Sequence, residues 1–385
     1  MKIHWFEAKQ IDRVTNFSTE TELIESALRQ NIDLQYYCTF AKKKIYFNLP
    51  NQINYLGQLK NRYLKYIEFH LLVVVKAIQI VLLQRKVVLM VNQDLIRLML
   101  PAYMLNAVFR RDNKFIVDIR TTPTNPASFD ADMISFHKKF KYSIKFFDGF
   151  SFITPFMEHY VMQPYKGSFK SVNWSSGVNV GLFKPEYYKR VENNKTTQLF
   201  YHGGLSISRG NLDVIKAVEP LIKAGYAIEL VQIGILVDDC IKTYIKEHNL
   251  STWCKLLDPV SLSEIPQMIV DCDLPVLPFP NFMAWRVSSP IKLMEYLAMG
   301  KKVLAPKMES FTDVFGIESD LVYYYNTSDK DQVPALTQKI KEIIDSQILD
   351  ECHFHPESRA FVESKYTWQR QAEQLFNFCN DLWIK

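Results

Sequence analysis

Short apolar runs alternate along this chain with segments whose apolar residues recur every three or four positions. Such runs are typical of buried strands, and the periodic segments are typical of amphipathic helices. In the first half the pattern predicts strands at Lys2–Phe6, Leu34–Phe40, Lys86–Val91, Phe115–Ile119 and Gly149–Thr154. It predicts helices at Leu23–Leu28, Tyr63–Leu83, Asp94–Val108 and Glu158–Met162.

The alternation continues in the second half, with strands at Gln198–Tyr201, Ala227–Ile233, Lys255–Leu257, Leu274–Leu277 and Lys302–Ala305. Helical periodicity covers 211–224, 238–248, 263–271, 291–299, 334–346 and 359–383. Strands and helices in turn favour doubly wound parallel sheets. We therefore predict an α/β protein with two Rossmann-like domains, 1–185 and 186–365, facing a ligand cleft at the carboxyl ends of their strands.

Length and composition agree with a globular protein, because 385 residues suit two domains and 48% of them are hydrophobic. The most apolar run, Leu71–Leu83, is interrupted by Lys76 and Gln79, so we expect a buried helix too short to span a bilayer. The first residues lack a signal-peptide pattern. Six unpaired cysteines indicate reduced thiols, and together these features predict a cytoplasmic protein.

The net charge of +5 is unevenly distributed. Residues 1–185 hold 25 Lys and Arg and 14 Asp and Glu, a balance of +11, whereas the remainder holds 21 and 27, a balance of −6. A basic half suits an acidic partner such as anionic lipid headgroups, although solvated surface lysine explains it equally well. Tyr63, Tyr66 and Phe69 recur at helical spacing among lysines, which fits either a membrane surface or an ordinary amphipathic helix. We expect peripheral contact with the inner face of a membrane, and no nucleic acid partner because no nucleic-acid motif is present.

The segment Ser288–Ala305 reads as a loop, a short helix ended by Gly300, and a buried strand. Unpaired backbone N–H groups at the start of such a helix bind phosphate well. Glu295 lies one turn into the helix, where a carboxylate can accept hydrogen bonds from sugar hydroxyls. Phosphate and ribose side by side indicate a nucleotide, although the helix dipole alone also favours a carboxylate there.

A second motif follows the strand at 198–201, where Gly203 and Gly204 let the backbone approach a ligand closely. Arg209 comes six residues after Gly203, just before the next helix, and a guanidinium there can bind a diphosphate in bidentate geometry. The alternative is an ordinary strand-to-helix turn with a surface arginine.

With these motifs the chain resembles GT-B glycosyltransferases of the family 4 type, which are retaining enzymes that use nucleotide-sugar donors. The resemblance extends from about residue 115 to the end and depends on the order and spacing of six motifs. These are Gly203-Gly204 with Arg209-Gly210, Glu295 with Ala298–Val303, Trp174–Pro185, Gly234, Leu256–Val260 and Tyr366–Trp368. In the family the last helix, here 366–385, crosses back to the first domain.

The resemblance implies a role for each matching residue. Ser288, Ser289 and Ile291 hold the donor diphosphate, while Arg209 and Lys292 neutralise it in place of a divalent metal. Glu295 binds the ribose, and Pro259 and Val260 lie against the base beside the glycine turn at Gly234. No cofactor or metal is expected besides the nucleotide-sugar donor. The acceptor is a saccharide or a lipid-linked molecule, in the setting of surface polysaccharide biosynthesis.

The chain departs from the family in three places. A first glutamate of the late motif is missing, since Val287 occupies its position, and Lys302 replaces a usual proline. No histidine lies between His70 and His137, where many members have one. Asp118 and Arg120 end a buried strand, which predicts either catalytic residues near the donor sugar or acceptor, or a structural Asp–Arg pair.

Two other functions stay open. The missing glutamate and histidine fit a catalytically degenerate GT-B-like protein that binds nucleotide sugars or serves as a partner subunit. A sugar-nucleotide epimerase has the same fold class, but it usually carries more carboxylates and histidines than this sequence offers. Cys352, His353 and His355 lack a second ligand pair, so a zinc site is not expected.

Overall fold

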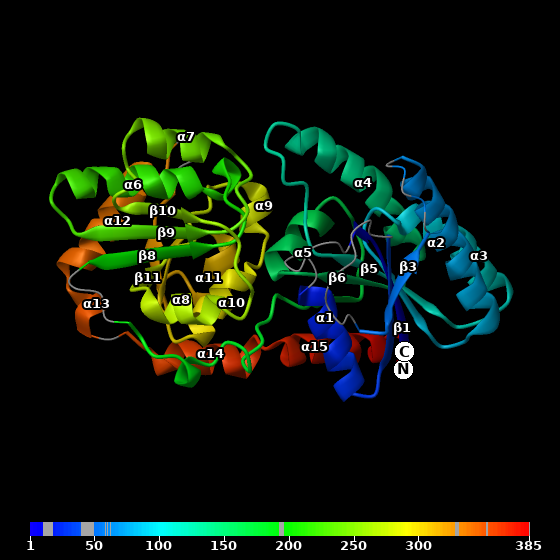
Figure 1. The fold of residues 1–385 in the computed structure, drawn as a ribbon. Coiled ribbons are helices and arrows are strands. Elements are labelled where there is room, and N and C mark those ends of the chain that lie inside the picture. The colour runs from blue at the N-terminus through cyan, green and yellow to red at the C-terminus, as the bar shows by residue number, and fades with distance from the viewer. Residues whose placement is uncertain are drawn as a thin grey trace. The chain divides into compact units, whose positions relative to one another are not determined.

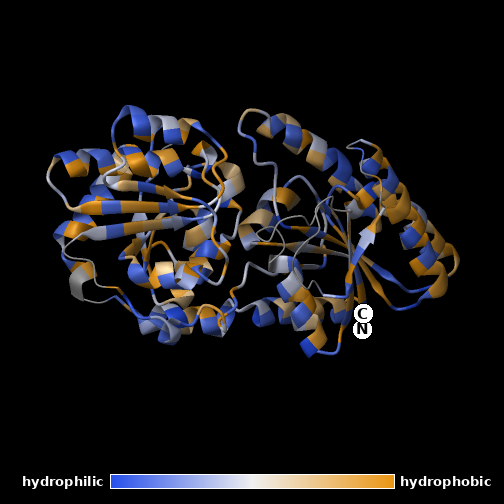
Figure 2. Ribbon diagram, viewed as in Figure 1, coloured by the Kyte–Doolittle hydropathy of each residue, from blue (hydrophilic) through white to orange (hydrophobic). Residues whose placement is uncertain are grey.

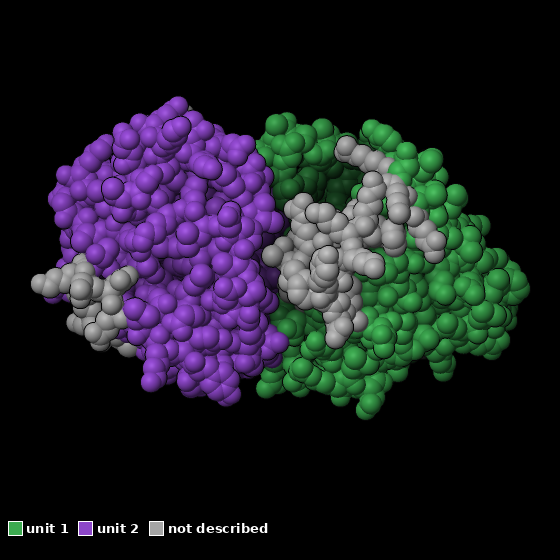
Figure 3. Space-filling model, in the orientation of Figure 1, with its two compact units in different colours: residues 1–175, 368–385 green, residues 176–367 purple. Residues whose placement is uncertain are grey.

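The computed structural model describes residues 1–10, 18–39, 50–57, 59, 61, 63–191, 196–327, 331–351 and 353–384. The chain divides into two compact units (Figures 1 and 3). Unit 1 combines Met1–Ser175 with Trp368–Lys385, and unit 2 is Ser176–Thr367. The sequence predicted the division after residue 185. In the structure, 176–185 belongs to unit 2, because Val178 pairs with Thr367 and Phe183 lies in the core of that unit.

Unit 1 is built on a seven-stranded sheet in the order β3-β2-β1-β4-β5-β6-β7. All its strand pairs are parallel. The strands are β1 (Lys2–Gln10), β2 (Asp33–Thr39), β3 (Ile53–Leu56), β4 (Val88–Val91), β5 (Lys114–Ile119), β6 (Gly149–Phe152) and β7 (Ser171–Asn173). The order reverses between β1 and β4, so ligands are expected at the carboxyl ends of these strands.

Helices connect the strands of unit 1 and cover its sheet. They are α1 (Ser18–Arg29), α2 (Leu64–Leu83), the 3-10 turn η2 (Ile96–Met99), α3 (Leu100–Val108), α4 (Phe129–Phe146), α5 (Pro155–Met162) and α15 (Trp368–Asp381). The final helix, α15, packs against α1 and β7, because its buried residues recur at helical spacing on one face.

Helix α2 differs from its prediction. It was expected to be a buried helix, but its inward face alone, made of Phe69, Val73, Ala77, Ile80 and Val81, is buried. The opposite face is apolar as well and remains exposed. Within the described residues this is the one helix that is long and apolar enough to cross a membrane.

Unit 2 has a four-stranded parallel sheet, β10-β9-β8-β11, and a parallel pair, β12-β13. The two are joined where the Leu277 amide donates to the Leu304 carbonyl at 2.8 Å. Its strands are β8 (Thr197–His202), β9 (Ile228–Ile233), β10 (Cys254–Leu257), β11 (Leu274–Pro275), β12 (Val303–Pro306) and β13 (Val322–Tyr325).

Helices again alternate with these strands. They are η3 (Pro185–Tyr187), η4 (Ile207–Arg209), α6 (Asn211–Lys223), α7 (Cys240–Glu247), α8 (Ile265–Asp271), α9 (Met283–Arg286), α10 (Ile291–Ala298), α11 (Glu309–Phe315), α12 (Val333–Asp345), α13 (Ile348–Glu351) and α14 (Pro356–Lys365). The strand order of unit 2 reverses between β8 and β11, as in a doubly wound sheet. The predicted α/β fold with two parallel sheets is therefore confirmed.

Candidate donor site

The carboxyl end of β8 in unit 2 is shaped by glycines. Gly203 follows this strand at φ 127°, and Gly234 follows β9 at φ 149°. A Cβ atom on Gly234 would lie 1.8 Å from the Gly203 carbonyl oxygen, so a side chain there has no room. The paired glycines thus allow the ends of β8 and β9 to approach each other closely.

Lys292 occupies the space that the missing side chain of Gly203 leaves. A Cβ atom on Gly203 would lie 2.3 Å from Lys292 Cε and 2.9 Å from its Nζ. The ammonium lies 5.6 Å from the centroid of the Tyr201 ring. Burial, helped by the charge of Arg209, lowers the pKa of Lys292 to about 7, while Glu295 acts in the opposite direction. This lysine therefore exchanges a proton near neutral pH.

Arg209 lies on the loop between β8 and α6, in the short turn η4 that ends at Gly210 with φ 77°. Its guanidinium carbon is 5.4 Å from the Trp285 ring centroid. The Trp285 indole in turn donates to the Ser208 carbonyl at 2.7 Å, which ties α9 to this loop. Arg209 and Lys292 therefore bring two cations of unit 2 together at the end of β8.

Glu295 is buried and bound to His202, the last residue of β8. Its Oε2 lies 2.7 Å from His202 Nε2, and the Tyr296 hydroxyl lies 3.0 Å from His202 Nδ1. The His202 backbone N–H donates to the same hydroxyl at 3.2 Å, so the hydroxyl hydrogen is available to Nδ1. In the neutral ring this arrangement leaves the proton on Nε2, where it donates to the Glu295 carboxylate.

The loop before α10 is held by contacts inside unit 2. The Ser289 carbonyl accepts a hydrogen bond from Ser176 Oγ at 2.6 Å, and Ser288 Oγ donates to the Trp285 carbonyl at 2.8 Å. Pro290 is the N-cap of α10, and its side chain makes no capping bond. Helix α10 begins at Ile291, one residue before Lys292, and phosphate binding by the Ile291 amide stays a prediction.

The residues predicted near the base lie on neighbouring strand ends. The Gly234 amide donates to the Leu257 carbonyl at 3.0 Å, and Pro259 and Val260 follow β10 after one intervening residue. Because β8, β9 and β10 are parallel neighbours, their carboxyl ends share one edge of the sheet.

Another cavity of unit 2 does not involve the predicted donor residues. It has a volume of about 310 Å³ and is lined mainly by apolar surface from Pro185, Tyr188, Val270, Met299 and Phe354, together with Lys301 and others. Among its charged lining residues, Lys301 already donates to two backbone carbonyls and Arg190 pairs with Asp273.

Val287, at the position where the family 4 pattern has its first glutamate, is fully buried at the end of α9. A carboxylate at this buried position would lose its hydration, which is costly unless a hydrogen-bond partner replaces the water. The departure from the family pattern is therefore consistent with the local packing.

Asp118 and Arg120 lie in unit 1 and are joined through Trp174. Asp118 Oδ1 accepts from Ser151 Oγ at 2.6 Å and from the Trp174 indole at 3.0 Å. Arg120 stacks on the Trp174 ring at 3.8 Å and donates to the Trp174 carbonyl at 2.6 Å. Burial raises the pKa of Asp118 and lowers that of Arg120. These contacts favour the structural alternative, and a catalytic role stays a prediction.

A cluster of charged residues in unit 1 was not found from the sequence. Lys9 Nζ lies 2.5 Å from Glu20 Oε1, and the Tyr36 hydroxyl donates to Glu7 Oε2 at 2.8 Å. Burial, helped by the charge of Glu20, raises the pKa of Glu7 to about 7. Glu7 and Lys9 lie toward the end of β1, next to the point where the strand order reverses, so they are candidates for contact with a ligand.

Glu7→Gln is expected to stabilise the protein by about 1–3 kcal/mol at about pH 8 and to have little effect at about pH 5. The pKa of Glu7 is raised on folding, so its contribution to stability is present below its unfolded pKa and is lost as the pH rises through about 7. Glutamine removes the charge and can still accept from Tyr36. Thermal unfolding at both pH values tests this, and an equal effect at both would contradict it.

No family model and no curated protein matches this sequence. Solved structures match over the whole chain at 12% identity. A glycosyltransferase from Rickettsia africae gives a TM-score of 0.67 and covers 100% of this chain and 99% of its own. Sucrose-phosphate synthase from Thermosynechococcus elongatus gives 0.73 with 99% and 98% covered, and HepE from Anabaena, solved with UDP, gives 0.70 with 99% and 100% covered.

At such low identity the matches define the fold. The chain has the GT-B fold of these glycosyltransferases, as the resemblance in sequence predicted. The family 4 assignment and the retaining mechanism stay predictions.

His202 is the residue of this site that had no predicted role. The signal available in the sequence was a polar ring at the carboxyl end of a buried strand, directly before the paired glycines. Its partner Glu295 is 93 positions away, so the pairing appears only in the structure.

Proposed function

We propose that this protein is a glycosyltransferase that transfers a sugar from a nucleotide diphosphate sugar. The observation that carries the proposal is the convergence of Arg209, Lys292 and Glu295 on Gly203 and His202 at the carboxyl end of β8. Two cations beside a helix start suit a diphosphate, and a buried carboxylate held by histidine suits ribose hydroxyls. The GT-B neighbours support the same reading, since HepE was solved with UDP and with UDP and glucose.

The proposed chemistry needs charge stabilisation above all. The leaving diphosphate gains negative charge as the glycosidic bond breaks, and cations aimed at that charge lower the barrier. Arg209 and Lys292 supply this charge within unit 2 and, in the proposed mechanism, replace a divalent metal. The retaining course follows from the family 4 resemblance, with Ser288, Ser289 and Ile291 on the diphosphate and Pro259, Val260 and Gly234 near the base.

The acceptor is proposed to be a saccharide or a lipid-linked molecule in surface polysaccharide biosynthesis, on the cytoplasmic side of a membrane. This part is supported by the resemblance and by the +11 charge balance of residues 1–185. The polar cluster of Glu7, Lys9 and Glu20 is a candidate for acceptor contacts in unit 1.

The proposal predicts turnover of a nucleotide sugar that is unaffected by chelator. The experiment is a panel of UDP-, GDP- and ADP-sugars, with and without EDTA, that records thermal stabilisation and release of the nucleotide. We expect one donor to stabilise the protein and to be hydrolysed slowly, and proton NMR to show that the released sugar first keeps its anomeric configuration. If no donor binds and none is turned over, the proposed function is refuted. Loss of activity in EDTA would refute the metal-free mechanism.

A catalytically degenerate nucleotide-sugar binding or partner protein is the second candidate. The observation that favours it is the buried Val287, an apolar residue at the position where the family 4 pattern has its first carboxylate. Under this alternative the same panel gives thermal stabilisation without turnover.

A further inference from the structure

Helix α2 of unit 1 carries an exposed apolar stripe. The side chains of Leu64, Ile67, Leu71 and Val75 are 51–63% exposed, and Leu83 at the end of the helix is 73% exposed. They recur at intervals of three and four along the outer face of the helix. Figure 2 shows α2 mostly in the hydrophobic colour along its length. Soluble monomers seldom expose such a continuous stripe, so this face calls for a partner.

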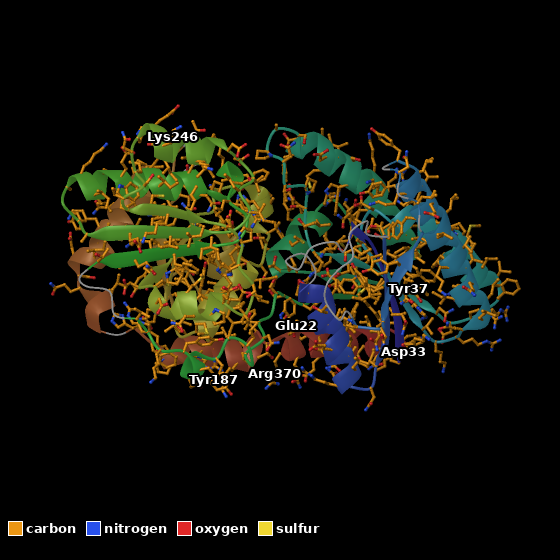
Figure 4. The ribbon with its side chains drawn as sticks, in the orientation of Figure 1. Glu22, Asp33, Tyr37, Tyr187, Lys246 and Arg370 are labelled. Atoms are coloured by element: carbon orange, nitrogen blue, oxygen red, sulfur yellow. The ribbon has the colours of Figure 1, made fainter. Side chains whose placement is uncertain are left out.

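One charged residue of α2 is directed toward the sheet of unit 1. Lys76, in the middle of the helix, lies with its ammonium 5.8 Å from the ring centroid of Tyr37, a residue of β2 that Figure 4 labels. Phe69 is buried on the inner face, while Tyr63 and Tyr66 are 75% and 44% exposed. The predicted aromatic group therefore divides between the core and the exposed start of the helix.

Helix α3 widens this surface, because it packs beside α2 in unit 1. Met104 is 66% exposed, Val108 is 74% exposed, and Phe109 directly after the helix is 49% exposed. We call the exposed apolar residues of α2 and α3 together the apolar face.

Basic residues gather where both helices end. Asn113 connects the two ends, since its side chain donates to the Gln84 carbonyl at 3.2 Å and its own carbonyl accepts from Asn106 at 3.0 Å. Four cations adjoin this point: Arg85, Lys86, Arg110 and Arg111. Residues 60–111 hold nine Lys and Arg but two Asp and Glu, a net charge of +7 that exceeds the +5 of the whole chain.

We propose that the apolar face and this basic edge dock unit 1 on an anionic lipid bilayer, with α2 and α3 lying in the plane of the interface. Apolar side chains enter the acyl boundary, and each cation near an anionic surface adds about 1 kcal/mol. Helix α2 does not cross the bilayer in this arrangement, because its inner face is part of the core of unit 1. The inference concerns unit 1 alone and holds whether or not the donor site acts as proposed.

Charge distinguishes a bilayer from a second copy of the chain as the occupant. Two copies meeting through this face would bring two segments of +7 together, which opposes association. An anionic bilayer offers the opposite charge beside an apolar interior, so both features of the surface are satisfied at once.

The test is flotation of the full chain with vesicles of phosphatidylcholine alone or with about 30% phosphatidylglycerol, at low and high salt. We expect the protein to float with the anionic vesicles and to lose at least about tenfold in binding at high salt. The double variant Leu71→Glu/Val75→Glu should remain with the soluble fraction and keep its melting temperature, since both side chains are exposed. The matched control Leu262→Glu/Ile317→Glu adds the same charge at exposed apolar positions of unit 2 and should float normally.

A second pair of variants tests the basic edge. Arg85→Glu/Lys86→Glu should reduce binding to anionic vesicles strongly, whereas Lys246→Glu on α7 should have little effect. Equal flotation of the apolar-face variant and the wild type would overturn the proposal, as would no flotation of the wild type. If the wild type forms dimers and does not bind vesicles, and Leu71→Glu/Val75→Glu is monomeric, the face belongs to an interface with a second copy instead. Donor binding measured on the same samples separates failure of docking from failure of the proposed function.

Discussion

Glu295→Ala is expected to weaken binding of the nucleotide-sugar donor by about 30- to 300-fold. The carboxylate is buried one turn into α10 and is proposed to bind the ribose hydroxyls. Hydrogen bonds to a charged group contribute about 1.5–3 kcal/mol each, and the loss of one or two gives this range. Because the ribose does not react, the effect should appear mainly in Kd or KM and little in kcat. Isothermal titration with the best donor measures it.

Two controls make the result specific. Glu295→Gln keeps the shape and one acceptor oxygen, so its loss should be smaller than that of the alanine variant. Glu219→Ala removes a hydrogen-bonded carboxylate from α6, where its partners are Lys223 and Tyr244, and should leave donor affinity unchanged. An unaltered donor Kd in Glu295→Ala would show that the ribose assignment is wrong.

His202 should act through Glu295 as a positioning residue. His202→Ala removes the hydrogen bond at 2.7 Å, and KM for the donor should rise severalfold with kcat nearly constant. His202→Gln can still donate to the carboxylate, so it should recover most of the lost affinity. A merely structural histidine would instead lower thermal stability in His202→Ala without changing the KM of the folded protein.

Most of the fold follows from local patterns. The strands β1, β4, β5, β8 and β9 lie in the interior of their sheets, are buried, and were predicted as continuous apolar runs. The edge strands β3 and β7 were not predicted, because they are short and half exposed and lack that signal. Strand β13 was also omitted, although it is a continuous run of valine and tyrosine. Helix α4 was also omitted, although its buried residues Met133, Phe136 and Phe140 recur at helical spacing.

Surface exposure was the feature that local patterns could not supply. The apolar residues of α2 indicate burial equally well for both faces of the helix, and the fold alone determines that one face meets the sheet. The same limit applies to Asp118 and Arg120, whose partner Trp174 is more than fifty positions away.

The candidate donor site could be proposed from the sequence where its residues are close together along the chain. Gly203, Gly204 and Arg209 belong to one loop, and Ser288 to Glu295 belong to one helix start. The contacts between these two segments, such as Lys292 with Gly203 and Glu295 with His202, depend on how β8 and α10 pack. The low pKa of Lys292 follows from that packing, since burial is its largest cause.

Lys292→Met is expected to lower kcat/KM for the donor by about 100- to 1,000-fold, as for other groups that stabilise a developing negative charge. Methionine keeps much of the length and volume of the side chain beside Gly203 and removes the charge. Thermal melting should show a stable protein, because a buried ammonium is costly in the absence of donor. Lys246→Met on α7, a surface lysine labelled in Figure 4, is the control and should leave the rate unchanged.

The pKa of Lys292 near 7 makes donor binding dependent on pH in a defined direction. An anionic diphosphate binds the protonated lysine, so the fraction ready to bind falls as the pH rises through about 7. The wild-type Kd should therefore rise up to about tenfold per pH unit above that value, and binding should take up a proton. Calorimetry in two buffers of different ionisation enthalpy measures this uptake. In Lys292→Met both the uptake and this pH dependence should disappear, and if they persist, another group carries the proton and Lys292 does not contact the diphosphate.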